Sequence, residues 1–339
     1  MNKLPPIIEC VPNFSEGRDK AVIDAIAQAI SAVEGVKLMH VDMGEDANRT
    51  VMTFAGDPEA VVKAAFEAIR IASEKIDMRS QTGAHPRIGA TDVCPLVPVA
   101  NISLEEVVVY ARELGQKVGE ELGIPVFLYE VAATVPERKN LATIRSGDYE
   151  GLAVKLKDPN WKPDFGSTAF NARAGATVIG ARDFLLAYNV NLNTRSLALA
   201  KAIAAEIRES GRITIENGKK IRISGRCKAV KAIGWYMESF GLAQVSMNLV
   251  NRHITPLHIA FETCREIAAM HGVEVTGSEL IGMVPLQVFV DAGIYFAQKQ
   301  ALHPAELSES ELIAIAVQSL GLDALGPFSA RDRIIEYQL

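Results

Sequence analysis

Cysteine is scarce in this sequence, and long apolar runs are missing from it. The four cysteines lie far apart, with no C-x-x-C pair and no His/Cys cluster at zinc spacing; they are Cys10, Cys94, Cys227 and Cys264. We expect them to be reduced thiols in a core. No run is long and apolar enough to span a bilayer, and residues 1–6 do not lead into an apolar signal segment. These absences predict a cytoplasmic protein.

An excess of positive charge is also missing. The formal net charge is −6, and no basic tail or Lys/Arg-dense stripe appears along the 339 residues. Nucleic acid is therefore a poor fit as the main partner. Phosphate-binding and nucleophile-elbow motifs of the types GxxxxGK, GxGxxG and GxSxG are absent too. The acidic pairs Glu45-Asp46 and Glu120-Glu121 have no converging ligands, so we expect solvated charge there and no metal site.

What remains is the composition of a globular protein, with 49% apolar and 22% charged residues. At roughly 150 residues per domain, the length predicts two domains or two halves of one unit. We place the boundary between an N-terminal subdomain, residues 1–180, and a C-terminal subdomain, residues 181–339.

The first half alternates strand and helix patterns. Apolar periodicity predicts strands at 7–12, 36–41, 49–54, 93–99 and 125–129, and helices at 20–33, 58–76 and 104–122. The residues from Asn13 to Asp19 read as a polar connector. The order β-α-β-β-α-β, with one further helix and strand, indicates a ferredoxin-like α+β unit with helices on one face of its sheet. Two short helical pieces, at 140–144 and 149–156, precede an irregular stretch.

The second half roughly repeats this order. Strands are predicted at 184–189, 230–237, 243–249 and within 273–284, and helices at 194–209, 256–270 and 285–298. The segment 212–226 contains Asn217-Gly218, a strong turn signal, and predicts a hairpin. We therefore expect two ferredoxin-like subdomains with helices on their outer faces and a ligand groove between the halves.

The most informative segment is the polar loop from Gly83 to Asp92. Gly83 and Gly89 can take backbone angles that other residues avoid, while Pro86 fixes its own φ and pushes His85 toward an extended conformation. An imidazole with a pKa near ~6.5 can both accept and donate a proton at cellular pH. His85 is therefore the lead candidate for acid–base catalysis, although a lone histidine can simply satisfy a turn.

A carboxylate could hold the His85 tautomer, and two candidates stand open. Asp42 is predicted at the end of a strand, and Asp92 closes the polar loop. Arg87 has Asp92 as its one obvious local partner. It is either a surface ion pair or a bidentate clamp on a substrate carboxylate.

Two other segments contain candidate ligand contacts. The stretch from Trp161 to Gly175 is either a linker or a bed for a flat heterocycle, because its aromatic side chains are costly to leave in water. Asn189 and Asn191 are two residues apart in a strand and share one face. They either fix the strand register or bind amide-like or pterin-like ligand edges.

The combined motifs resemble the glutamate formiminotransferase family, which also forms the formiminotransferase part of formiminotransferase–cyclodeaminase. The resemblance covers essentially the whole chain and is carried by residues 9–17, 48–51, 83–98, 163–166, 187–192, 233–236 and 334–337. The chain ends just after the last of these motifs, which implies a single-activity enzyme without the cyclodeaminase part.

The resemblance implies transfer of a formimino group from N-formimino-L-glutamate to N5 of tetrahydrofolate in histidine breakdown. Tetrahydrofolate is then a co-substrate, no metal is expected, and a homodimer is favoured. The family's catalytic histidine falls on His85. Its folate-contacting segment falls on Gly166, Ser167, Thr168, Ala169, Phe170, Asn171, Ala172, Arg173, Ala174 and Gly175.

The predicted site therefore has His85 and Asp42 as catalytic residues. Its substrate-binding residues are Arg87, the segment 166–175 and Asn189. Two rival functions remain open at this point: a glutamate formyltransferase on the same scaffold, and a folate-binding protein without turnover. An acid–base histidine favours an enzyme over a pure binder.

Overall fold

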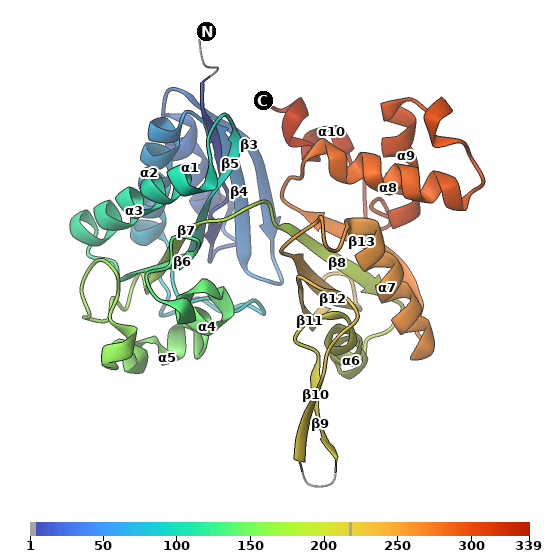
Figure 1. Ribbon diagram of the computed structural model, residues 1–339. Coiled ribbons are helices and arrows are strands. Elements are labelled where there is room, and N and C mark those ends of the chain that lie inside the picture. The colour runs from blue at the N-terminus through green and yellow to red at the C-terminus, as the bar shows by residue number, and fades with distance from the viewer. Residues whose placement is uncertain (1–4, 217–218) are drawn as a thin grey trace. The chain divides into compact units, whose positions relative to one another are not determined.

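The structure is a computed structural model that describes residues 5–216 and 219–339. The chain forms two compact units (Figure 1), which we call unit 1 (Met1–Asp183) and unit 2 (Phe184–Leu339). Residues 1–4 and the predicted Asn217-Gly218 turn lie outside the described residues.

Unit 1 is built on one mixed sheet. Its strands are β1 (Ile7–Cys10), β2 (Asn13–Phe14), β3 (Val36–Gly44), β4 (Arg49–Gly56), β5 (Thr91–Ala100), β6 (Val126–Glu130) and β7 (Thr177–Ala181). Both β1 and β2 lie between β4 and β5 and pair with them antiparallel, while β3 pairs with the other side of β4. Taking β1 and β2 as one interrupted strand gives the ferredoxin-like order that the sequence predicts.

The predicted polar connector is wrong at its first two residues. Asn13 and Phe14 form β2, and the Phe14 ring is completely buried in the core of unit 1. A two-residue strand between polar neighbours carries too little periodicity to be recognised from the sequence.

Three helices cover one face of this sheet: α1 (Lys20–Ser31), α2 (Pro58–Lys75) and α3 (Leu104–Glu121). Each begins at a side-chain cap. The carboxylates of Asp19 and Asp57 accept backbone N–H groups of the first turn, and Ser103 forms a reciprocal capping box with Glu106. The predicted helices run one or two residues too far at their C-terminal ends.

The far edge of the sheet has helices on its second face as well. Strand β7 pairs in parallel with both β5 and β6. The short helices α4 (Leu141–Arg145) and α5 (Asp148–Lys155) pack there through a small core of their own, which includes Phe127, Val178, Ile144 and Leu152. The prediction that helices cover one face of the sheet therefore holds for only part of unit 1.

Unit 2 repeats the strand order. Its strands are β8 (Leu186–Leu192), β11 (Val230–Met237), β12 (Leu242–Leu249) and β13 (Val275–Ile281), in the order β11-β12-β8-β13, with α6 (Leu197–Ile207) and α7 (Leu257–Met270) in the crossovers. The side chains of Tyr188 and Val190 pack into the core that contains these helices. Asn189 and Asn191 alternate with them on the opposite face, as predicted.

Unit 2 has two further parts besides this sheet and its crossover helices. Strands β9 (Arg212–Glu216) and β10 (Lys219–Ile223) form a separate antiparallel ribbon (Figure 1). After β13 come α8 (Leu286–Lys299), α9 (Glu309–Leu320) and the short α10 (Ala330–Arg333). The apolar pattern of the sequence predicts α8, whereas α9 and α10 are not predicted. Within the described residues, no helix is long and apolar enough to cross a membrane.

Candidate functional site

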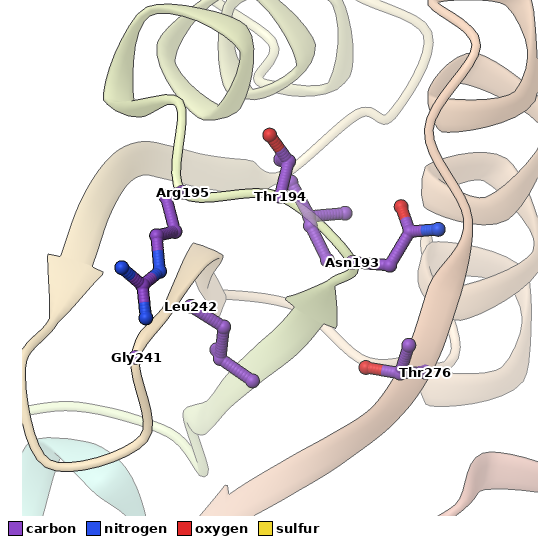
Figure 2. Close-up of a pocket in the computed structure, with 7 residues that line it drawn as sticks. Asn193, Thr194, Arg195, Gly241, Leu242 and Thr276 are labelled. Carbon is purple, nitrogen blue, oxygen red and sulfur yellow. The ribbon is translucent and has the colours of Figure 1, made fainter.

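A pocket of about 290 Å³ opens in unit 2 (Figure 2), at the end of β8 and beside the β11–β12 turn. Its lining includes Asn193, Thr194, Thr276 and the cationic side chain of Arg195. None of the predicted site residues lines it. They lie elsewhere, and most of them lie in unit 1.

The polar loop and the predicted folate segment lie side by side in unit 1. The Ala90 N–H donates to the Ala174 carbonyl at 2.8 Å, and the Ala176 N–H donates to the Ile88 carbonyl at 3.0 Å. At the crossing, a Cβ on Gly89 would be 2.1 Å from the carbonyl oxygen of Ala176. Only glycine fits at position 89, because the two backbones approach each other so closely there.

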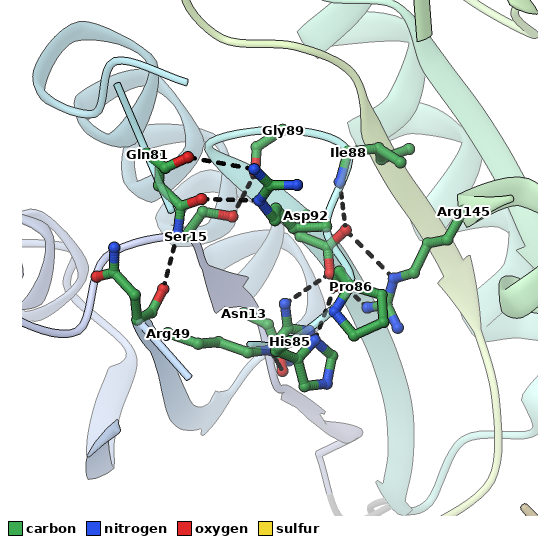
Figure 3. Close-up of polar contacts among 12 residues, drawn as sticks. Asn13, Ser15, Arg49, Gln81, His85, Pro86, Ile88, Gly89, Asp92 and Arg145 are labelled. Carbon is green, nitrogen blue, oxygen red and sulfur yellow. Dashed lines mark hydrogen bonds and ion pairs between the residues drawn. The ribbon is translucent and has the colours of Figure 1, made fainter. Parts of the chain in front are cut away.

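His85 is half-buried in the loop that precedes β5 (Figure 3). Its Nδ1 lies 2.7 Å from the Pro86 carbonyl oxygen, which can only accept, so Nδ1 carries the proton and Nε2 carries the lone pair. Burial lowers the pKa of His85 well below its ordinary value, and the nearby charges of Arg49 and Arg145 lower it further. The predicted near-neutral pKa is therefore wrong, and the imidazole is neutral at pH 7.

Asp92 organises the charges around this histidine. Its carboxylate is completely buried and accepts from Arg49 Nη1 at 2.7 Å, from both Nε and Nη2 of Arg145, and from the Ile88 N–H at 3.0 Å. Burial acts to raise its pKa, but the two guanidiniums outweigh burial and lower it to about 2. These four bonds occupy the acceptor sites that a carboxylate has. Asp92 therefore holds the loop and the two arginines in place.

Two residues of this cluster, Arg49 and Arg145, are not among the predicted site residues. Arg49 begins β4 and is 8% exposed; its Nε also donates to Asn13 Oδ1 at 3.0 Å, and burial lowers its pKa to about 10. Arg145 ends α4. The signals available for Arg49 were its place at the start of the apolar strand 49–54 and within the motif 48–51 that carries the family resemblance. Nothing local links either arginine to a carboxylate more than 40 residues away.

Asp42 lies within β3, opposite Val51, and not at a strand end as predicted, because β3 continues to Gly44. Its Oδ2 is 3.7 Å from Nε2 of His40. Its proposed role, orienting the His85 ring, stays a prediction.

Arg87 is held by other groups than the predicted Asp92. Its Nη1 and Nη2 donate to the two carboxylate oxygens of Glu150 at 2.9 and 2.7 Å, and its Nε donates to Gln81 Oε1 at 2.8 Å. The Arg87 side chain is 11% exposed, whereas Glu150 is 65% exposed. The fork that could grip a substrate carboxylate is thus occupied by an accessible carboxylate of the chain itself.

The segment 166–175 has an exposed half and an anchored half. Gly166, Ser167, Thr168, Ala169 and Phe170 are exposed, and the Phe170 ring lies against Tyr149 with centroids 5.5 Å apart. Ala174 and Gly175 are buried, Asn171 Oδ1 accepts the Ala174 N–H, the Ala172 carbonyl accepts the Tyr149 hydroxyl, and Arg173 reaches Asp77. The residues 166–170 thus form an exposed ledge, and the anchored half joins the segment to the histidine loop at Ala174. Trp161, by contrast, packs on Phe127 in the small core.

The predicted residue Asn189 lies in unit 2. It is 4% exposed on β8 and donates through Nδ2 to Glu279 Oε2 at 3.1 Å. Among residues 5–216 and 219–339, no group of three or more His, Cys, Asp or Glu side chains gathers as ligands of a metal ion would. All four cysteines are buried and unbridged, and the Sγ atoms of Cys10 and Cys94 are 3.5 Å apart.

The fold is thus that of a two-unit α+β protein with two ferredoxin-like units, and its candidate site in unit 1 is a histidine near a buried Asp–Arg cluster. The chain belongs to the formiminotransferase domain family. Residues 7–182 match the family described as the N-terminal subdomain of the formiminotransferase domain. Residues 187–339 match a second family, described as the formiminotransferase domain.

Curated relatives agree with this family. The chain is 43% identical to a glutamate formimidoyltransferase of Streptococcus pyogenes serotype M1, over 86% of this chain and 93% of the relative. It is also 43% identical to a glutamate formimidoyltransferase of Thermoplasma acidophilum, over 90% and 97%. It is 48% identical to the formimidoyltransferase-cyclodeaminase of Rattus norvegicus over 98% of this chain, which spans 59% of that longer relative.

Proposed function

We propose that this protein transfers the formimino group of N-formimino-L-glutamate to N5 of tetrahydrofolate, giving 5-formiminotetrahydrofolate and L-glutamate, as a step of histidine degradation. The relatives named glutamate formimidoyltransferase support this assignment. The observation that carries it is the neutral His85 imidazole, whose Nδ1–H is tied to Pro86 and whose lone pair is on Nε2. Tetrahydrofolate is the co-substrate, and the site requires no metal.

The histidine serves both proton transfers of the reaction. As N5 of tetrahydrofolate attacks the formimino carbon, its proton passes to Nε2 of His85 and a tetrahedral intermediate forms. The imidazolium then protonates the glutamate nitrogen, the bond between that nitrogen and the carbon breaks, and the neutral imidazole returns. General acid–base groups of this kind typically contribute about 10²–10⁴-fold to the rate.

The two arginines around Asp92 set the direction of this proton relay. Because Arg49 and Arg145 disfavour the imidazolium, the proton taken from N5 is held only weakly and is readily passed on. The Pro86 carbonyl orients the neutral ring through Nδ1–H, and the acceptor sites of Asp92 are already occupied. Asp42 is therefore proposed as the carboxylate that stabilises the imidazolium once Nε2 has taken up the proton.

Substrate binding is proposed at three places. The exposed ledge 166–170 with the anchored residues 171–175 contacts the folate, and Asn189 contributes an amide. Arg87 grips a carboxylate of formiminoglutamate, which would displace the exposed Glu150 from the fork. Bidentate pairing is the reason an arginine suits this role.

We also infer a cytoplasmic homodimer. The ribbon of β9 and β10 supports self-association, since an isolated two-stranded ribbon is only marginally stable in water, and this one exposes Ile213, Ile215, Ile221 and Ile223. Its residues 212–223 carry four cationic side chains and one anionic one, opposite in sign to the chain's net charge of −6. Sedimentation of the full chain should give twice the monomer mass of 36.7 kDa.

His85→Ala tests the proposal. The variant should lose about 10²–10⁴-fold in kcat, while the Kd for 5-formyltetrahydrofolate stays within about tenfold, because an acid–base group acts on the chemical step. His303→Ala, at an exposed histidine of unit 2, is the matched control and should keep the parent rate. Unchanged turnover in His85→Ala would overturn the assignment.

A further inference from the structure

One face of the unit 2 sheet carries a continuous row of polar side chains. Asn189 lies directly opposite Glu279 across the β8–β13 pair, and Gln244 lies opposite Asn191 and Trp235 across the neighbouring pairs. Asn191 and Gln244 are completely buried, while Glu279 and Trp235 are half-buried. The row is therefore buried in its middle and partly exposed at both edges of the sheet, at Glu279 on β13 and at Trp235 on β11.

Hydrogen bonds fix the orientation of every amide in this row. The Trp235 indole N–H donates to Gln244 Oε1 at 2.8 Å, so the Gln244 amide group must point its Nε2 the other way. That nitrogen donates to Asn191 Oδ1 at 2.7 Å and to Glu279 Oε2 at 3.4 Å. The result is a preorganised network in which the only charged member is Glu279.

The Glu279 carboxylate is satisfied on one side only. Both of its amide donors, from Asn189 and Gln244, go to Oε2. Among the described residues no lysine, arginine or histidine forms an ion pair with it, and Oε1 has no hydrogen-bond donor. Oε1 is not buried, so it is the oxygen of this carboxylate that a ligand can reach.

We propose that Glu279 is a ligand-binding residue whose carboxylate receives a planar ring edge with two adjacent N–H donors, the 2-amino and N3–H groups of the pteridine of tetrahydrofolate. Such an edge pairs with a carboxylate through two parallel hydrogen bonds. The inference rests on the proposed function and deepens it by naming the residue that recognises the folate ring.

A second feature favours a ring with an acceptor next to its donors. Nδ2 of Asn191 is buried and has no hydrogen-bond partner among the described residues. It lies diagonally across the sheet from Glu279. A pteridine presents its 4-oxo group next to the two donors, whereas the amidine of formiminoglutamate presents donors alone. Unpaired buried donors are rare enough to need a reason, and a ligand carbonyl is one.

Binding of 5-formyltetrahydrofolate, measured by calorimetry without turnover, tests the assignment. Glu279→Gln keeps the shape and both amide neighbours but removes the charge, and it should raise Kd at least tenfold. Glu279→Asp keeps the charge on a shorter side chain, and its Kd should lie between those of the parent and Glu279→Gln. The matched control is Glu274→Gln, because Glu274 is exposed and also accepts from an asparagine, Asn193; it should bind like the parent.

A folate analogue with methyl in place of the 2-amino group completes a thermodynamic cycle. The parent protein should bind it at least tenfold more weakly than 5-formyltetrahydrofolate, and Glu279→Gln should bind both ligands within about twofold, because coupled groups are non-additive. Equal losses in both proteins, or an unchanged Kd in Glu279→Gln, would overturn the proposal. So would an effect confined to the KM for formiminoglutamate. Because binding needs no turnover, these results stand apart from the His85 test.

Discussion

At the scale of single residues, the site depends on how charge is distributed around one imidazole. Asp92 offsets two arginines that would otherwise repel each other in a buried place. Burial and the charges of Arg49 and Arg145 lower the pKa of His85, whereas the Asp92 carboxylate acts in the opposite direction. The net result is an imidazole that is neutral near pH 7, as the proposed proton transfer from N5 requires.

The pH dependence of the reaction follows from the direction of that shift. The proposed mechanism uses His85 in its deprotonated form, and the pKa of His85 is lowered by burial and by Arg49 and Arg145. We therefore expect kcat/KM to stay level from pH 8 to about 6.5, the ordinary histidine pKa, and to fall only as pH drops through the lowered value. Arg145→Gln removes one of the cations and should move the acidic limb upward. A parent profile that already falls at pH 7 would contradict this account.

A Glu150 variant can distinguish the two roles considered for Arg87, an ion pair and a clamp on a substrate carboxylate. If Arg87 binds a carboxylate of the donor, Glu150 competes with the substrate for the same fork. Glu150→Gln should then lower the KM for formiminoglutamate by about two- to fivefold with little change in kcat, since an exposed ion pair is worth only about 0–1 kcal/mol. Steady-state kinetics with varied donor decides the point. A raised KM would mean that the pair serves only to hold the loop to α5.

At the scale of elements, the crossing of the histidine loop with the segment 166–175 decides whether the site is assembled. Gly175 has φ +69°, and a Cβ there would be 2.2 Å from the Ile88 carbonyl oxygen. Two restrictions therefore act at one residue, a left-handed backbone and a close approach to main chain.

Gly175→Ala should destabilise the protein by about 2 kcal/mol or more, combining left-handed strain of about 1–2 kcal/mol with the clash. It should also lower kcat, because the displaced segment carries the His85 loop with it. Gly151→Ala is the control: this glycine lies inside α5 with open space around it, and alanine there should stabilise by about 0.5–1 kcal/mol. Urea unfolding compares the two, and similar free energies of unfolding would show that the crossing is not a constraint.

Sequence periodicity predicts elements well where caps and alternation agree. The helices that begin at Asp19, Asp57 and Ser103 have a cap and an apolar stripe, and all three form. Helix α9 has the same signature, Ser308 with Glu311, and could have been found from it. Strand β2 could not, because its pairing with β4 and β5 comes from distant segments.

At the scale of the whole molecule, the order of elements predicts two ferredoxin-like units, and the family match agrees with it. The candidate site is less predictable. His85 and Arg87 stand out because glycine and proline frame them in sequence. Arg49, Arg145 and Glu279 acquire meaning only when the fold brings them to Asp92 and Asn189 from 43, 53 and 90 residues away. A sequence pattern carries no information on such tertiary pairs.

The central claim is that this chain moves a formimino group between glutamate and a folate. The most direct measurement gives the purified protein tetrahydrofolate and either N-formimino-L-glutamate or N-formyl-L-glutamate, and follows the folate product. We predict rapid 5-formiminotetrahydrofolate formation from the formimino donor and little or no product from the formyl donor. Faster transfer from the formyl donor, or folate binding without product from either one, would contradict it.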